Sequence, residues 1–322
     1  MNKSQIIASK DSKPKRRRFN TAYLFIGPYA IIFLVFVVLL ILISFLLSFA
    51  YYDGVNMPRF IGLTNYVTLF TQDLDFMQSA LPNTIKYALI VGPVGYMLAF
   101  ILAWILAQLP RRFRNVAAII LYSPSLTGSV LISVVWKAMF SGDSRGYINY
   151  LLLNWGMINE PLQFLQDTTT IFIIMVFVGL WSSMGIGFLA MLSGILNTNR
   201  EIYEAAYVDG MKNRFQEIIY ITIPSMKPQM MFGAVMAIVS TFNSAGLATA
   251  LTGASPTPQL AGWLISDHMQ DYAFSRMEMG YASSLSVVLL MLVLVFYFVA
   301  NHLFKSDDWL WKKQLNPKIK SS

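Results

Sequence analysis

The chain has 322 residues, of which 56% are hydrophobic and only 12% are charged. Soluble domains carry about a quarter charged residues, so this composition excludes an ordinary soluble protein and indicates a polytopic membrane protein. The formal net charge of +8 does not indicate nucleic-acid binding. The basic residues gather in the tails and in short loops, where the positive-inside rule places them.

Cysteine is absent, and the only histidines are His268 and His302. The lack of cysteine excludes disulfides, thiol catalysis and cysteine-based metal sites. Two histidines alone do not favour a zinc site. We therefore expect this chain to have no catalytic residues and to bind neither a metal nor a cofactor of its own.

The chain begins with a basic run over residues 13–18, followed by an apolar run over residues 23–50. The apolar run is longer than the core of a signal peptide, and no small-residue cleavage site interrupts it. We predict a first membrane helix there, preceded by a basic cytoplasmic tail over residues 1–20 that contacts anionic lipid.

Six segments are long and apolar enough to cross a bilayer, which takes about 20 residues at about 1.5 Å per residue. They are residues 23–50, 84–108, 116–140, 170–196, 229–251 and 280–304. The pattern predicts an all-α fold with a six-helix transmembrane domain over residues 21–305. A second cytoplasmic tail is expected over residues 306–322.

The distribution of basic residues predicts the orientation. If the N-terminus is cytoplasmic, 19 of the 24 lysines and arginines lie inside and 5 lie outside. A distribution as one-sided as this favours a multi-pass protein of the cytoplasmic (inner) membrane, with both termini in the cytoplasm.

The sequence contains no obvious source of energy for transport. The span interiors carry essentially no ionisable residues, which disfavours a proton- or ion-coupled transporter. The phosphate-binding pattern G-x-x-x-x-G-K-[ST] is absent as well, so the chain does not hydrolyse ATP. Either the protein is passive, or another polypeptide supplies the energy.

The inner loop over residues 197–228 has the signals of ordered structure. Thr198 and Glu201 fit a capping box at a helix start, and Gly210 suits the left-handed position after a helix end. Asn213 is a candidate N-cap for a second helix, which we expect Pro224 and Pro228 to break. The alternative is an amphipathic helix resting on the membrane surface.

The loop sequence Glu204-Ala205-Ala206-x-x-Asp209-Gly210, with Ile221 to Pro224 after it, resembles the EAA loop of binding-protein-dependent ABC importer permeases. The similarity is to the carbohydrate-uptake group that includes the maltose permease subunits. Further similar patterns are Phe60-Ile61-Gly62-Leu63-x-Asn65-Tyr66, Asn83-Thr84, Pro124 with Trp136, and Gly146-x-x-Asn149. One departure is the spacing from Gly210 to Ile221, which is ten residues rather than the usual nine.

The resemblance implies a type I importer permease fold and a set of partners. A second, similar permease would complete the pathway, and an extracytoplasmic binding protein would deliver the solute. Two ATPase subunits would bind ATP and Mg, so this chain would need no cofactor. The implied coupling residues in the loop are Glu204, Ala205, Ala206, Asp209, Gly210 and Pro224.

The near-absence of charge in the spans favours a neutral solute, because a charged one needs a fixed counter-charge. Aromatic, amide and hydroxyl groups suit sugar rings, and six such residues fall within or beside the last three spans. They are Trp181, Ser182, Ser183, Asn243, Ser244 and Tyr281. Helix packing is the commoner role of such residues.

We therefore interpret the chain as a permease subunit for a sugar or oligosaccharide, and not as an enzyme. Two alternatives are ABC import of another neutral solute and a self-sufficient channel or facilitator. A membrane-embedded enzyme would need clustered acidic, histidine or serine residues at a membrane face, and the sequence has no convincing cluster of that kind.

Overall fold

A computed structural model describes residues 21–127 and 129–315, which are mostly helical. The basic tail predicted over residues 1–20 and the end of the C-terminal tail, residues 316–322, lie outside the described residues. Within them, the only strands are β1 (Ala50–Tyr51) and β2 (Arg59–Phe60), which form a short antiparallel hairpin.

The first predicted span consists of α1 (Thr21–Phe33), the π-helical turn η1 (Leu34–Val38) and α2 (Leu39–Leu47). Its residues 26–47 are apolar enough to cross a membrane, and their side chains are exposed in the isolated chain. A surface of this kind requires lipid or a partner protein around it. The chain divides into two compact units at residue 44, and the second holds all the remaining elements.

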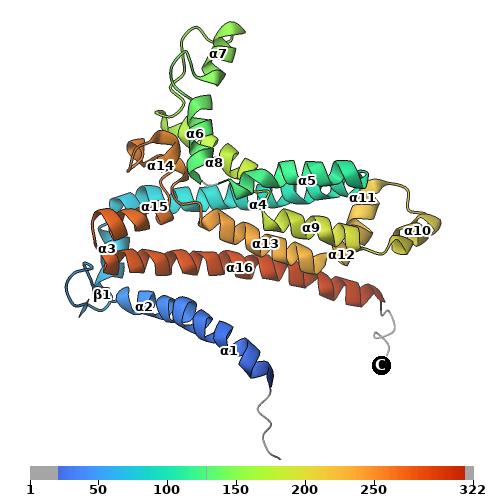
Figure 1. The fold of residues 1–322 in the computed structure, drawn as a ribbon, viewed down its shortest axis with the longest axis horizontal. Coiled ribbons are helices and arrows are strands. Elements are labelled where there is room, and N and C mark those ends of the chain that lie inside the picture. Colours follow the sequence, from blue (N-terminus) through green and yellow to red (C-terminus); the bar gives the residue numbers. More distant parts are fainter. Residues whose placement is uncertain (1–20, 128, 316–322) are drawn as a thin grey trace, which may run out of the picture. The chain divides into compact units, whose positions relative to one another are not determined.

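The second unit contains the other predicted spans and the loops between them (Figure 1). The elements up to residue 197 are α3 (Thr64–Thr71), η2 (Phe76–Ala80), α4 (Leu81–Ala107), α5 (Arg111–Leu126), α6 (Ser129–Met139), α7 (Tyr147–Asn154), α8 (Thr168–Ser182) and α9 (Ile186–Asn197). The elements after them are α10 (Arg200–Val208), α11 (Arg214–Glu217), η3 (Ile218–Thr222), α12 (Ile223–Ser225), α13 (Lys227–Phe242), α14 (Leu247–Thr252), η4 (Pro258–Leu260), α15 (Ile265–Gln270), η5 (Asp271–Ser275) and α16 (Met279–Leu315).

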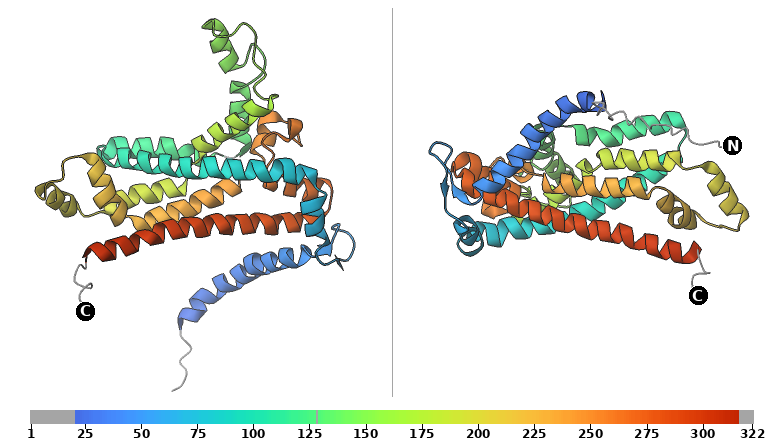
Figure 2. Two further views of the ribbon diagram at one scale, coloured as in Figure 1. Left: turned by 180° about the vertical axis from the view of Figure 1, so that it is seen from behind. Right: turned by 90° about the horizontal axis from the view of Figure 1, so that it is seen from below.

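The core of this unit is built from α4, α9, α13 and α16, which lie side by side in the views of Figures 1 and 2. Small residues allow the helices to approach closely. A Cβ atom on Gly187 of α9 would lie 3.2 Å from the backbone of Gly233 on α13. The crossing of α9 and α13 therefore depends on glycine at both positions.

Replacing Gly187 with alanine is expected to lower the free energy of unfolding by about 1–3 kcal/mol, because the added methyl overpacks the crossing. Gly92→Ala is the matched control. Gly92 is also inside a helix, but a Cβ there would be 4.0 Å from its nearest neighbour. Thermal unfolding in detergent, followed by tryptophan fluorescence, should show a lower midpoint for Gly187→Ala only. Equal midpoints for both variants would contradict the close crossing.

We expected each span to be a single helix, but three of the predicted spans are interrupted. The third is divided into α5 and α6, the fourth into α8 and α9, and the fifth into α13 and α14. The fourth bends by 41° at its break. Gly246 explains the break in the fifth span, since its φ of +78° is left-handed.

Two asparagines from the sequence patterns hold loops at the ends of helices. The Asn65 amide donates to the carbonyls of Ser48 and Ala50, at 2.9 and 3.0 Å, and so pins α3 to the chain after the first span. Asn149 is fully buried, and its side chain both donates to and accepts from the backbone of Leu162. Both residues have a structural role that satisfies buried backbone groups.

Candidate functional site

A cavity of about 580 Å³ lies where the three interrupted spans meet. Thr127 lines it from the first break, Ser183 and Gly185 from the second, and Asn243 and Ser244 from the third. Non-helical backbone at membrane depth is tolerated only where it is buried in protein or lines a water-filled cavity. Breaks that converge on one cavity are typical of solute sites in transporters.

The polar groups of the cavity are suited to hydrogen bonding with a solute. The hydroxyls of Ser183 and Ser244 donate to carbonyls one turn back, at 2.6 and 3.0 Å. Their oxygen lone pairs therefore remain available as acceptors. The Asn243 amide makes no hydrogen bond within the described part of the chain, so it can both donate and accept.

The cavity wall has aromatic rings but no charge. Tyr87, Tyr96, Tyr122 and Phe188 line it, and no lining residue in the described ranges is acidic or basic. An ion in this cavity would be desolvated without a counter-charge, which is unfavourable. A neutral solute with many hydroxyl groups meets both hydrogen-bonding partners and ring faces.

The structure brings together four of the six residues predicted for the pathway. Ser182, Ser183, Asn243 and Ser244 all line the cavity. Trp181 lies outside it and packs edge-to-face on Trp136, with 5.4 Å between ring centroids.

Tyr281 lies in a different setting from the cavity residues. Its side chain is buried at the start of α16, and its hydroxyl donates to the carboxylate of Asp73 at 2.7 Å. Its residue type fits a sugar site, but the structure places it in a polar cluster of its own.

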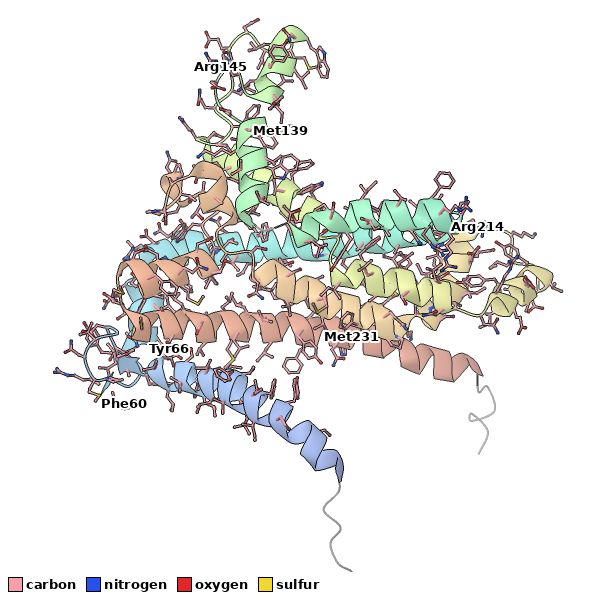
Figure 3. The ribbon with its side chains drawn as sticks, in the orientation of Figure 1. Phe60, Tyr66, Met139, Arg145, Arg214 and Met231 are labelled. Atoms are coloured by element: carbon pink, nitrogen blue, oxygen red, sulfur yellow. The ribbon has the colours of Figure 1, made fainter. Side chains whose placement is uncertain are left out.

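The second candidate site is the loop over residues 197–228, which we call the elbow. It lies at the opposite end of the long helices from Tyr66, as the position of Arg214 shows (Figure 3). The Tyr207 hydroxyl and the Arg214 guanidinium both donate to the buried carboxylate of Glu217, at 2.9 and 2.7 Å. These bonds fix α10 against α11, so the elbow is an ordered structure.

The caps of the elbow helices agree with the sequence prediction at two positions and differ at one. Asn213 caps α11, because its side-chain oxygen accepts from the Gln216 amide. Gly210 has φ +96° after α10, with paired backbone bonds from Gly210 and Met211 back to the last turn. The predicted Thr198 cap was wrong: Asn199 caps α10, and the Thr198 hydroxyl instead donates to Gly194.

The helix that Pro224 and Pro228 were expected to break does break between these two prolines. The helix continues through Pro224 to the end of α12, and the chain leaves helical geometry at Met226. The turn before it, η3, is a π turn, which contains one residue more per turn than an α-helix. Proline lacks the N–H that would close an α turn, so η3 accommodates both Pro224 and the extra residue between Gly210 and Ile221.

The predicted coupling residues form an outward surface on the elbow. The Glu204 side chain is 64% exposed and pairs with Arg200 at 3.0 Å. Ala205 is exposed, and Ala206 is half-buried. The face of α10 that carries Glu204 and Ala205 is therefore free to meet a partner.

Comparison with known proteins identifies the chain. Residues 95–306 match the family of binding-protein-dependent transport system inner membrane components. The probable ABC transporter permease protein YesP of Bacillus subtilis (strain 168) is 33% identical to this chain, over 89% of the chain and 91% of that protein. The chain belongs to this family of permeases. It is a transport subunit and not an enzyme.

Other relatives agree in length and fold. The arabinooligosaccharides transport system permease protein AraP of B. subtilis (strain 168) is 29% identical, over 85% of both chains. The lactose transport system permease protein LacF of Rhizobium radiobacter is also 29% identical, over 89% of this chain and 95% of that one. A bacterial ABC transporter for alginate import has the same fold, with a TM-score of 0.73 and 23% identity over 89% of this permease and 95% of that chain.

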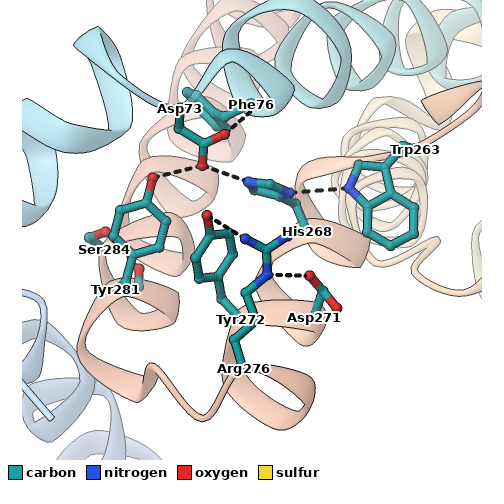
Figure 4. Close-up of polar contacts among 9 residues, drawn as sticks. All are labelled: Asp73, Phe76, Trp263, His268, Asp271, Tyr272, Arg276, Tyr281 and Ser284. Carbon is teal, nitrogen blue, oxygen red and sulfur yellow. Dashed lines mark hydrogen bonds and ion pairs between the residues drawn. The ribbon is translucent and has the colours of Figure 1, made fainter. Parts of the chain in front are cut away.

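The permease also has a buried polar cluster that the sequence did not predict (Figure 4). His268 Nε2 lies 2.8 Å from the Asp73 carboxylate, which also accepts from Tyr281. The Trp263 indole can only donate, and it points at His268 Nδ1 at 3.2 Å. The His268 proton is therefore on Nε2 and is donated to Asp73.

This cluster controls the protonation state of Asp73. Burial alone would raise its pKa, but the hydrogen bonds from His268, the Phe76 amide and Tyr281 lower the pKa of Asp73 to about 2. The carboxylate is thus charged at neutral pH and ties the turn between α3 and η2 to α15 and α16. The partners are 195 and 208 positions apart in the chain, so no local pattern revealed them.

Proposed function

We propose that the permease imports a neutral sugar or oligosaccharide through the cavity at the three helix breaks. The observation that carries this proposal is the uncharged cavity wall of hydroxyl, amide and aromatic groups. AraP and LacF belong to transport systems for arabinooligosaccharides and lactose, which supports this solute class.

The proposal includes six membrane crossings with both termini in the cytoplasm. The positive-inside distribution and the opposite placement of the elbow and α3 support this orientation. A second, similar permease would complete the pathway.

Energy is proposed to enter through the elbow. Two cytoplasmic ATPase subunits would bind ATP and Mg, and each permease would dock on one of them. The contacts of Glu217 with Tyr207 and Arg214 make the elbow stiff enough to transmit movement to α9 and α13. An extracytoplasmic binding protein would deliver the solute, and the alginate importer in complex with a pentasaccharide-bound periplasmic protein supports such a partner.

Reconstitution tests the proposed function. The complete transporter in proteoliposomes should accumulate a labelled neutral oligosaccharide, such as an arabinooligosaccharide, only when ATP and the binding protein are present. Uptake by this chain alone, without ATP, would instead support the passive channel. A complex that transports none of a panel of neutral saccharides would contradict the solute class.

Within that assay, Asn243→Leu is expected to lower the uptake rate about tenfold. The solute group that pairs with the amide would lose its partner, which costs about 1–3 kcal/mol. Asn301→Leu is the matched control, because Asn301 is half-buried on α16 and lies outside the cavity wall. Equal uptake by the two variants would remove Asn243 from the pathway.

A further inference from the structure

The short helix α14 has the features of a hinged segment. Gly246 before it and Gly253 after it have φ +78° and +74°, so a left-handed glycine lies at each end. Such residues absorb changes in backbone direction with little strain. α14 packs against α6 and α8, and its Ala248 and Leu251 are buried.

α14 lies at the outer-loop end of the cavity. Tyr87 and Val91 line the cavity, and the same apolar cluster continues through Ala248 and Leu251 of α14 to Leu264 before α15. Movement of α14 away from α8 would open this cluster and expose the cavity on that side.

Asp267 of α15 holds the first hinge. Its carboxylate is 3% exposed, and one oxygen accepts from the Gly246 amide while the other accepts from the Leu264 amide. The next residue, His268, is anchored to Asp73 beside α4 (Figure 4). α15 is therefore fixed to the rest of the outer end, and Asp267 connects it to the break in the fifth span.

We propose that Asp267 is the positioning residue that latches α14 across the extracytoplasmic end of the cavity, and that its release from Gly246 admits the solute. This inference rests on the proposed function and orientation. A carboxylate held by two backbone amides keeps the hinge in its observed conformation, and losing it leaves two buried N–H groups unsatisfied.

The electrostatics of the latch predict its pH dependence. The titratable groups that face Asp267 are Tyr87 from α4 and its neighbour His268, whose ring is turned to Asp73. Of the elements packed against α15, η2 has no titratable residue, Asp271 and Tyr272 of η5 bond with Arg276, and Tyr281 of α16 donates to Asp73. Burial raises the pKa of Asp267 to about 6, although the bonds from Gly246 and Leu264 act in the opposite direction.

An open latch would expose the carboxylate and return its pKa to the ordinary value. The closed state then binds a proton more tightly than the open state does, so acid favours closure. As the pH falls from 7.5 to 5, the ratio of the closed latch to the open latch should rise about tenfold.

Cysteine labelling in the assembled transporter tests the latch, because the natural chain has no cysteine. Ala237→Cys places a thiol in the cavity wall, and a membrane-impermeant maleimide is added to the outside of intact cells. Val55→Cys reports on orientation and folding, since Val55 is 89% exposed in the outer loop. Failure to label Val55→Cys would overturn the proposed orientation, whereas the remaining comparisons concern the latch alone.

At pH 7.5, adding Asp267→Ala should raise the labelling of Ala237→Cys at least fivefold. In Asp267→Asn the NH₂ would face the amide of either Gly246 or Leu264 in both orientations, so its labelling at pH 7.5 should also rise. Maleimide reacts with the thiolate, so each labelling rate is divided by that of Val55→Cys at the same pH. On this scale both variants should lose the pH dependence. The control is Asp271→Ala, a change at the residue directly after α15. Its labelling should equal that of the parent, which carries Ala237→Cys alone. Labelling of Asp267→Ala at the parent rate, or with the parent pH profile, would overturn the latch.

Discussion

Glu204→Lys is expected to abolish uptake while the permease still enters the membrane at its normal level. The Glu204 side chain is exposed and lies on the outward face of α10, where it contributes nothing to the core. In the proposed complex, this face docks on an ATPase, and a reversed charge at a close contact costs several kcal/mol. Uptake in cells and co-purification of the ATPase with the permease are the two measurements.

The ion pair with Arg200 supplies a matched control. Glu204→Lys also breaks this pair, so the double change Arg200→Glu with Glu204→Lys restores it in reverse. An exposed pair of this type contributes at most about 0.5 kcal/mol. The double variant should therefore remain inactive. If it regained transport, the internal pair rather than the partner contact would be the important one, and wild-type uptake by Glu204→Lys would contradict docking at this face.

The sequence predicted the helices of this permease better than the interruptions within them. Long apolar runs are a strong signal, because only a helix satisfies all backbone groups within one segment. The break at Ser183 has no comparable signal, since serine also occurs inside membrane helices. Its position depends on the neighbouring helices, which satisfy the freed backbone groups.

In the candidate sites too, features that depend on neighbouring residues were predicted, whereas contacts between residues far apart in the chain were not. The cap at Asn213 and the turn at Gly210 depend on residues within one turn, and both were predicted correctly. The break expected from Pro224 and Pro228 falls between them at Met226, whereas the π turn η3 before it was not predicted. Asn83 and Thr84 were recognised as a pattern, yet their contacts with residues 260–265 became visible only in three dimensions.

The burial of segment 261–268 was not predicted. All eight of its residues are buried, although Ser266, Asp267 and His268 are polar. Asp267 and His268 explain how polar residues can lie there, because each has specific hydrogen-bond partners. A sequence pattern records polarity, but it does not record whether a distant partner satisfies it.

Asp73→Asn is expected to destabilise the permease by about 3–5 kcal/mol, although it replaces only one oxygen with nitrogen. One carboxylate oxygen of Asp73 accepts from His268 and Tyr281, and the other accepts from the Phe76 amide. In either orientation, the asparagine NH₂ would face a donor. Breaking one member of a buried charged network leaves its partners unsatisfied, which accounts for the size of the loss.

Thermal unfolding of the detergent-solubilised permease should show this loss, and Asp75→Asn is the matched control because Asp75 is exposed two residues away. Since the pKa of Asp73 is lowered to about 2, its stabilisation is present above about pH 4 and is lost as the pH falls through 2. Tyr281→Phe removes one of the facing donors, so the double variant with Asp73→Asn should lose less than the sum of the two single changes. Strict additivity would mean that Asp73 and Tyr281 do not act through their shared hydrogen bond.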